Sequence, residues 1–228
     1  HRPDDAHRVE TKVQRHTPCE AREEILTDMA QEILKDKSNR CVYATIGASS
    51  HSDEDRVIND YYATDPNALE QLLKFEVFHE KVWEPACGGG HLSCVLEAHG
   101  YSVRNSDIVD RMGGGVEILD FIEGDTGVWE GDIITNPPYS FAQEFVEKAL
   151  STVVDGSKVA MFLKLTFLEG KRRKEMFAKY PPKRVYVFSH RVTCAKGGDF
   201  ASTKSSAVAY AWFIWEKGYS MDTIVRWI

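Results

Sequence analysis

The residues of this chain best suited to chemistry form one short segment, Asn136-Pro137-Pro138-Tyr139, directly after the run Asp132–Thr135. The side-chain oxygen of Asn136 and the carbonyl of Pro137 can both accept hydrogen bonds from a planar amino group. Two consecutive prolines restrict the backbone torsions that aim this carbonyl, and the ring of Tyr139 offers a flat face for stacking. The segment therefore suits the task of holding a flat NH2-bearing group, although a strand followed by a proline-rich turn is the alternative without activity.

A second candidate segment is the glycine-rich loop Glu84–Leu92, with the sequence EPACGGGHL. Glycines between a strand and a helix let the backbone approach a ligand closely. The spacing differs from that of a dinucleotide pyrophosphate loop, and Glu84 would repel a phosphate but favour an amino group. Asp107 ends the next predicted strand, where an acidic side chain can bind ribose hydroxyls. A ribose and an ammonium group without a phosphate indicate S-adenosylmethionine (SAM) as the ligand. For the glycines alone, a plain tight turn is the alternative.

These segments need a scaffold that brings the ends of strands together. From residue 61 onward, short apolar strands alternate with helices, which predicts an α/β fold with a mostly parallel, seven-stranded sheet covered on both faces. The last two strands leave no room for a helix between them, so we expect an antiparallel strand at an edge. Adjacent parallel strands end at one crevice, where both segments and Asp107 should meet. The expected strands are Val82–Glu84, Tyr101–Ile108, Val116–Phe121, Asp132–Asn136, Lys158–Leu165, Arg184–Ser189 and Val208–Trp215, and the helices begin near Asp65, His91, Phe141 and Lys171.

The glycine loop and the Asn136–Tyr139 segment together resemble the amino (N6-adenine) DNA methyltransferases of the class I SAM-dependent, Rossmann-like fold. The Pro-Ala-Cys form of the loop is similar to the subgroup whose cofactor motifs precede the catalytic motif, and Tyr61–Pro66 resembles that subgroup's N-terminal cofactor motif. The stretch is also similar to small phage and prophage methyltransferases. The resemblance covers residues 61 to about 217 and implies a site-specific enzyme that methylates adenine flipped out of duplex DNA.

The resemblance implies a cofactor role for two groups of residues. Asp107 would bind the ribose of SAM, and Asp120 would meet the amino group of its adenine ring. Ile108 and Phe121 would pack against that ring, although ordinary core packing is the alternative for both. The methionine part of SAM would be held by Tyr62, Thr64, Glu84, Pro85, Ala86, Cys87, Gly88 and Gly90.

The resemblance also implies how the target base is held. Asn136 and Pro137 would grip N6 of the target adenine, Pro138 would fix the turn, and Tyr139 would stack on the flipped base. The exocyclic amine is a poor nucleophile because its lone pair is delocalised into the ring. Two acceptors would draw the nitrogen toward tetrahedral geometry, so no strong base is needed before attack.

The charge of the chain is unevenly distributed, with a net value of −7. Residues 1–155 hold 14 Lys/Arg and 30 Asp/Glu, whereas residues 156–228 hold 14 Lys/Arg and 5 Asp/Glu. A basic carboxyl-terminal third predicts a face that binds a polyanion, with a solvated basic helix as the alternative. Residues 191–206 form the candidate recognition segment, for which a surface loop is the alternative. The candidate nucleic-acid contacts are Lys171, Arg172, Arg173, Arg191, Lys196 and Lys204.

The rest of the sequence sets limits on the class of protein. No apolar run is long enough for a membrane span and no signal peptide is visible, so we expect a cytoplasmic protein without a membrane partner. Five irregularly spaced cysteines predict reduced thiols, and the cluster from Cys87 to His99 matches no usual zinc spacing, so no metal is expected. Residues 1–60 are expected to form an extension with a disordered start, one amphipathic helix to about Lys37 that could support self-association, and a linker.

Three other functions remain open at this point. RNA adenine methylation differs from the first hypothesis only in the nucleic acid. A protein glutamine methyltransferase would also need Asn-Pro-Pro-Tyr, but its glycine loop usually has a different sequence. The third alternative is a catalytically inactive SAM-fold module that binds nucleic acid. The presence of Asn136 and Tyr139 argues against it.

Overall fold

The computed structural model describes residues 62–196, 198, 200 and 208–228 of the chain. These residues all belong to one compact unit. The expected N-terminal extension, including its amphipathic helix and its boundary at residue 60, lies outside the described residues. Within the described part, no helix has the length and apolar character that crossing a membrane requires.

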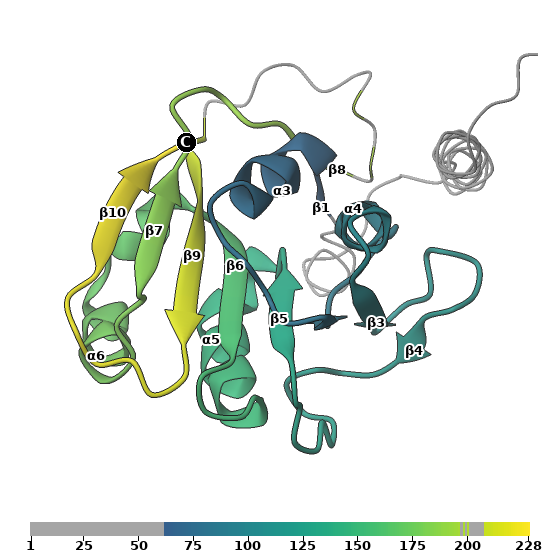
Figure 1. The fold of residues 1–228 in the computed structure, drawn as a ribbon, viewed down its shortest axis with the longest axis horizontal. Helices are drawn as coiled ribbons and strands as arrows, with labels where there is room; N and C mark the ends of the chain where they lie inside the picture. Colours follow the sequence, from purple (N-terminus) through teal and green to yellow (C-terminus); the bar gives the residue numbers. More distant parts are fainter. Residues whose placement is uncertain (1–61, 197, 199, 201–207) are drawn as a thin grey trace, which may run out of the picture. The chain divides into compact units, whose positions relative to one another are not determined.

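Ten strands and four α-helices make up the described part (Figure 1). The strands are β1 (Tyr62–Thr64), β2 (Lys81–Glu84), β3 (Ser102–Asp107), β4 (Glu117–Ile118), β5 (Asp132–Thr135), β6 (Lys158–Lys164), β7 (Arg184–Val187), β8 (Cys194–Lys196), β9 (Tyr210–Glu216) and β10 (Ile224–Trp227). The helices are α3 (Pro66–Leu73), α4 (His91–Ala98), α5 (Ala142–Thr152) and α6 (Lys171–Lys179), and short 3-10 turns span Tyr139–Phe141 and Leu165–Leu168.

Eight of these strands form one sheet in the order β10-β7-β9-β6-β5-β2-β3-β4. All neighbours are parallel except β9, which runs antiparallel to both β6 and β7. The predicted α/β class, the mostly parallel sheet and the antiparallel strand are therefore confirmed. Parallel strands joined by helices place the carboxyl ends of β2, β3 and β5 at one edge of the sheet, as the sequence analysis requires.

The expected position of the antiparallel strand at an edge is wrong. Strand β9 lies inside the sheet, between β6 and β7. Its first six residues are all buried, and an interior place covers such a strand on both faces and pairs its backbone on both sides. The edge is formed by β10, an unexpected eighth strand that runs parallel to β7. The predicted strand over residues 116–121 shrinks to the two exposed residues of β4.

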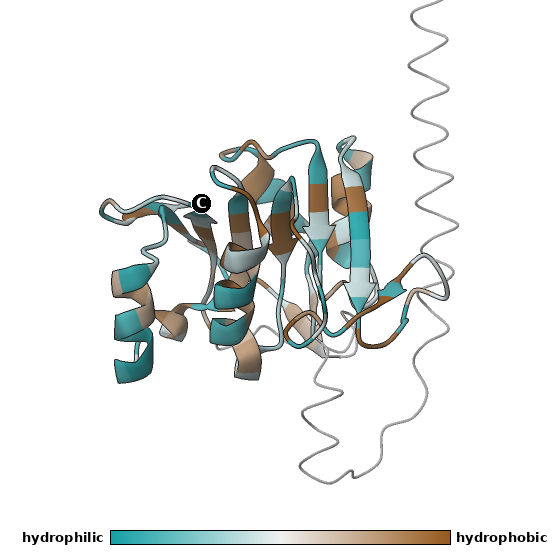
Figure 2. Ribbon diagram, turned by 90° about the horizontal axis from the view of Figure 1, so that it is seen from below, coloured by the Kyte–Doolittle hydropathy of each residue, from teal (hydrophilic) through white to brown (hydrophobic). Residues whose placement is uncertain are grey.

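Helices cover both faces of the sheet. Along β6, Ala160 and Phe162 pack with α3 and α4 on one face, whereas Val159, Met161 and Leu163 pack with α5 and α6 on the other. This alternation follows from the two-residue period of a strand. Figure 2 shows brown hydrophobic segments within several strands of the sheet, while the helices carry both brown and teal residues.

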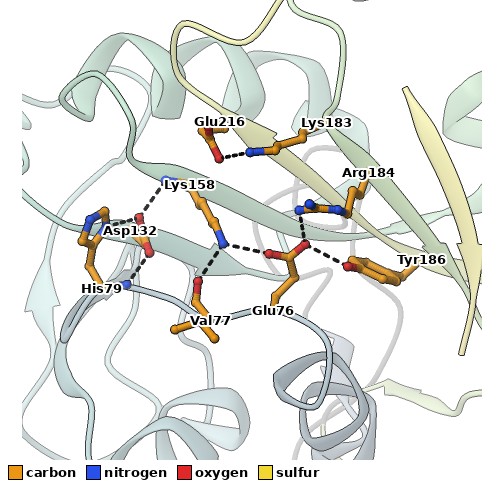
Figure 3. Close-up of polar contacts among 9 residues, drawn as sticks. All are labelled: Glu76, Val77, His79, Asp132, Lys158, Lys183, Arg184, Tyr186 and Glu216. Atoms are coloured by element: carbon orange, nitrogen blue, oxygen red, sulfur yellow. Dashed lines mark hydrogen bonds and ion pairs between the residues drawn. The ribbon is translucent and has the colours of Figure 1, made fainter. Parts of the chain in front are cut away.

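A polar network joins the amino-terminal ends of the strands, opposite to the candidate site (Figure 3). The carboxylate of Glu76, which is 3% exposed, accepts hydrogen bonds from Lys158 (2.8 Å), Arg184 (2.7 Å) and the hydroxyl of Tyr186 (2.8 Å). Burial alone would raise the pKa of Glu76, but the hydrogen bonds from Lys158 and Tyr186 and the two nearby cations outweigh it and lower the pKa. Glu76 is therefore a buried anion held by two cations.

The same end of the sheet holds a second buried carboxylate, that of Asp132 (Figure 3). It accepts hydrogen bonds from the backbone amides of His79 (2.6 Å) and Lys158 (2.7 Å). The Nδ1 atom of His79 lies 2.8 Å from Asp132 Oδ1. Together the two carboxylates attach residues 76–79 to the first residues of β5, β6 and β7.

The two remaining strands form a separate antiparallel pair, here called the β1–β8 ribbon. Tyr62 pairs with Lys196, and Thr64 pairs with Cys194. The backbone amide of Asp65 continues the contact by donating to the carbonyl of Thr193 (3.2 Å). The ribbon brings together two segments about 130 residues apart in the sequence, and no local sequence pattern predicted it.

Candidate active site

A cavity of about 480 Å³ opens at the carboxyl ends of β2, β3 and β5. Its size is in the range typical of small-molecule sites. The structure brings nearly all of the predicted cofactor and catalytic residues into its lining. These are Tyr62, Thr64, Glu84, Pro85, Ala86, Cys87, Asp107, Ile108, Asp120, Phe121, Asn136, Pro137, Pro138 and Tyr139.

The glycine loop lies between β2 and α4, and its glycines shape the loop without lining the cavity. Gly90 precedes α4 with a φ of 77°, a left-handed conformation that favours glycine. A Cβ atom at Gly90 would lie 2.8 Å from the terminal carbon of Met112. The amide of Gly88 donates to Asp107 Oδ2 (2.8 Å) and that of Cys87 to the carbonyl of Ser106 (3.1 Å). The end of β3 therefore fixes the loop.

Glu84 places a buried carboxyl group at the base of this loop. Its side chain accepts a hydrogen bond from the hydroxyl of Ser93. Burial raises the pKa of Glu84 to about 8, the negative charge of Asp107 adds to the rise, and the Ser93 hydrogen bond opposes it. Glu84 is therefore mostly protonated at neutral pH, and a cationic group placed beside it would favour the ionised form.

Asp107, at the end of β3, uses both of its carboxylate oxygens. Besides the amide of Gly88, Asp107 accepts hydrogen bonds from the amide of Val109 (3.1 Å) and from Arg111 Nη1 (3.2 Å). A carboxylate has about four acceptor positions, so one remains for a ligand hydroxyl. Arg111 also lines the cavity and was missed in the sequence, because its pairing with Asp107 depends on the irregular turn after β3.

The residues expected around the adenine ring of the cofactor differ in their environments. Ile108 is 47% exposed, so core packing does not account for it. Phe121 is 2% exposed and its ring lies 5.2 Å from those of both Trp83 and Phe145, so it belongs to the core as well as to the cavity wall. The side chain of Asp120 accepts hydrogen bonds from two backbone amides in the following turn.

The Asn136 carboxamide has a defined orientation. Its Nδ2 atom donates to the backbone carbonyl of Tyr62 at 3.0 Å, and the opposite orientation would bring two oxygens together. The Oδ1 atom of Asn136 is buried and has no hydrogen-bond partner in the part of the chain that the structure describes. An acceptor is therefore held in place and left available for a donor from a ligand.

The backbone carbonyls of the two prolines have different partners. The carbonyl of Pro138 accepts a hydrogen bond from the amide of Phe141 (2.9 Å) and closes the 3-10 turn. The side chain of Pro137 is buried, and no residue in the described ranges donates to its carbonyl. The backbone thus leaves the Pro137 carbonyl as a second acceptor next to Asn136.

Tyr139 is surrounded by aromatic and polar groups. Its ring lies 6.2 Å from that of Tyr62 and 6.0 Å from that of Tyr210, and Lys164 Nζ lies 4.7 Å from its centre. The hydroxyl of Tyr139 is 3.4 Å from the sulfur of Cys194. Burial raises the pKa of Tyr139 well above its usual value, so the hydroxyl stays protonated. The predicted stacking on a target base stays a prediction.

The predicted contacts on α6 lie outside the cavity lining. Lys171 and Arg172 are exposed on α6. Arg173 has a structural role, because its Nε atom donates to the carbonyl of Glu169 (2.7 Å) and its guanidinium lies 5.0 Å from the ring centre of Phe167. The first two remain candidates for contact with a polyanion, and Arg173 also stabilises the turn before α6.

The candidate recognition segment is described only in part. Arg191 is exposed, the side chain of Lys196 is not described, and Lys204 lies outside the described residues. Phe200 places its ring 5.6 Å from that of His91, which lines the cavity at the start of α4. One aromatic residue of the segment therefore lies next to the candidate site.

Comparisons with known proteins identify the fold. No protein-family model matches the chain, and no curated protein does. A candidate RNA methyltransferase from Pyrococcus horikoshii superimposes with a TM-score of 0.52 and 16% identity, over 79% of this chain and 97% of that one. A candidate class I SAM-dependent methyltransferase from Listeria monocytogenes gives a TM-score of 0.49 and 14% identity, over 72% and 62% of the two chains. The fold is that of class I SAM-dependent methyltransferases.

Proposed function

We propose that the chain is a methyltransferase that transfers a methyl group from SAM to the N6 amino group of adenine in DNA. The observation that supports this proposal is the Asn136 carboxamide, whose oxygen is buried without a partner among the described residues and which lines the same cavity as the glycine loop and Asp107. An unsatisfied buried acceptor costs about 1–3 kcal/mol. An N–H donor from a bound amine would remove that cost.

The lining of the cavity fits SAM better than a phosphate-bearing cofactor. Arg111 is the only Arg or Lys in the lining that the described residues provide, and it already pairs with Asp107. Glu84 and Asp107 suit an ammonium group and a ribose hydroxyl, while Ile108 and Phe121 provide apolar surface. When bound, SAM supplies an electrophilic methyl group.

The chain's own residues would prepare the amine. Asn136 Oδ1 and the carbonyl of Pro137 would accept the two N–H hydrogens of the target amino group. This contact would draw the nitrogen toward tetrahedral geometry and localise its lone pair for attack on the methyl group. Fixed positioning of this kind can supply several kcal/mol of the barrier reduction.

DNA is the nucleic acid that the sequence resemblance favours, and the exposed Lys171 and Arg172 offer contacts to its backbone. RNA adenine methylation is the second candidate. It is supported by the likeness of the fold to the candidate RNA methyltransferase from Pyrococcus horikoshii.

A methyl-transfer assay tests the proposal. The protein is incubated with methyl-labelled SAM and duplex DNA, single-stranded DNA, RNA or a release-factor protein, and labelled adenine is identified by mass spectrometry. Label on N6 of adenine in DNA is expected, label only in RNA selects the second candidate, and label only in protein refutes both. Asn136→Ala should abolish transfer but keep SAM binding, whereas Asn67→Ala, at an amide of α3 outside the cavity, is the matched control.

A further inference from the structure

Cys194 lies directly beside the candidate catalytic turn. It is 6% exposed, and its sulfur is 3.4 Å from the hydroxyl of Tyr139 and 3.9 Å from Nδ2 of Asn136. Both contacted residues are more than 50 residues away in the sequence. Cys194 itself does not line the cavity, although both residues that it contacts do.

The β1–β8 ribbon supplies a second contact to the same turn. Thr64 of β1 is paired with Cys194 of β8, and two residues earlier in β1 the carbonyl of Tyr62 accepts the hydrogen bond from Asn136. The Nδ2 atom of Asn136 therefore faces one group from each strand of the ribbon. With both contacts in place, the carboxamide cannot rotate without losing a hydrogen bond.

The chemistry of the thiol favours positioning over reaction. Burial raises the pKa of Cys194, with hydrogen bonds from Tyr139, Tyr210 and Asn136 opposing the rise. The sulfur therefore remains a neutral thiol, which is a poor nucleophile. A neutral thiol is both a weak donor and a weak acceptor, so it can contact the amide of Asn136 and the hydroxyl of Tyr139 at once.

We propose that Cys194, acting with the β1–β8 ribbon, is a positioning residue that holds Asn136 and Tyr139 in the geometry needed for methyl transfer. The inference rests on the proposed function, because it assigns a role within the same site. Loss of the thiol would leave Asn136 Nδ2 with only its hydrogen bond to Tyr62 and would remove the contact of Tyr139, so both side chains would be held less tightly, while the glycine loop and Asp107 stay unchanged. The turnover rate should therefore fall, while SAM affinity is preserved.

Three variants test this role. In Cys194→Ala, kcat should fall about tenfold, because a small misplacement of catalytic groups slows the reaction. The Kd of SAM should stay within about twofold of the wild-type value. Cys194→Ser, which keeps a hydroxyl donor and acceptor, should recover most of the loss. Cys94→Ala, at a half-buried thiol of α4, is the control and should match wild type. An equal fall in kcat and SAM affinity in both Cys194 variants would show a merely structural role and overturn the inference.

A measurement independent of activity separates this inference from the proposed function. The side-chain amide signal of Asn136 in a ¹⁵N–¹H spectrum can be identified by its absence in Asn136→Ala. Cys194→Ala should shift this signal and speed its exchange with water, and an unchanged signal would overturn the inference. If wild-type protein methylates no nucleic acid, the proposed function fails, but this spectrum still reports whether Cys194 fixes Asn136.

Discussion

Removing the charge of Glu76 should destabilise the fold strongly and leave the active site intact. In Glu76→Gln, Lys158 and Arg184 lose their anionic partner at a site where the Glu76 side chain is only 2% exposed. Breaking a buried ion pair by removing one partner typically costs about 3–5 kcal/mol. The two cations keep 19% and 24% exposure, so water can partly solvate them, and we expect the lower end, about 3 kcal/mol.

The loss should be measured by urea unfolding at pH 7. For a chain of this size, about 3 kcal/mol corresponds to a fall in Tm of about 6–12 °C. Glu80→Gln is the matched control, because Glu80 is an exposed acid four residues away and should change stability by less than about 0.5 kcal/mol. SAM binding at 20 °C should not change in either variant, since the network lies at the opposite end of the strands from the cavity.

The stabilisation by Glu76 should depend on pH. The pKa of Glu76 is lower in the folded state than its usual value of 4.5, so its contribution is present above pH 4.5 and is lost as the pH falls through the lowered value. The difference between wild type and Glu76→Gln should therefore shrink below pH 4.5. A Glu76→Gln protein as stable as wild type at pH 7 would refute the assignment of Glu76 as a buried, stabilising anion.

Further predictions concern the glycine loop and the basic surface. The pKa of Glu84 is raised from 4.5 to about 8, so wild-type stability should decline between pH 4.5 and 8, and Glu84→Gln should remove this decline in urea titrations. Gly90→Ala should weaken SAM binding at least about tenfold by calorimetry, because alanine is strained at positive φ and would contact Met112. Lys171→Gln should lower the slope of log K for DNA binding against log salt concentration by about one, whereas Lys81→Gln, at the amino end of β2, should leave the slope unchanged. Equal slopes in the two variants would show that Lys171 does not contact DNA.

The fold could be predicted where the apolar pattern was strong. Strands β5, β6 and β9 are short runs of buried residues, and their alternation with helices was enough to indicate a parallel sheet. Strand β10 could not be predicted, because all four of its residues are exposed and no buried face marks it as a strand. The position of β9 between β6 and β7 could not be predicted either, because it depends on pairing between distant segments and not on a local sequence pattern.

The site was predictable where its residues are close in sequence. The glycine loop and the Asn136–Tyr139 turn each follow a strand, so the rule that parallel strands end at one crevice brought them together correctly. Arg111 could not be found in this way, because the segment from Asp107 to Arg111 is not helical and the rule for charge pairs four residues apart applies to helices. Cys194 could not be found in this way, because its contact with Asn136 depends on the β1–β8 ribbon and not on any local pattern.

The two halves proposed for the site, one for the cofactor and one for the amine, are held by different parts of the fold. The cofactor half is fixed from within the sheet, through the contacts of Gly88 and Cys87 with the end of β3. The amine-holding half is fixed from outside the sheet, because Asn136 is oriented by the carbonyl of Tyr62 and contacted by Cys194 of the ribbon. Because Cys194 does not line the cavity, loss of its contact should lower turnover while SAM binding persists, whereas a change in the glycine loop should weaken SAM binding.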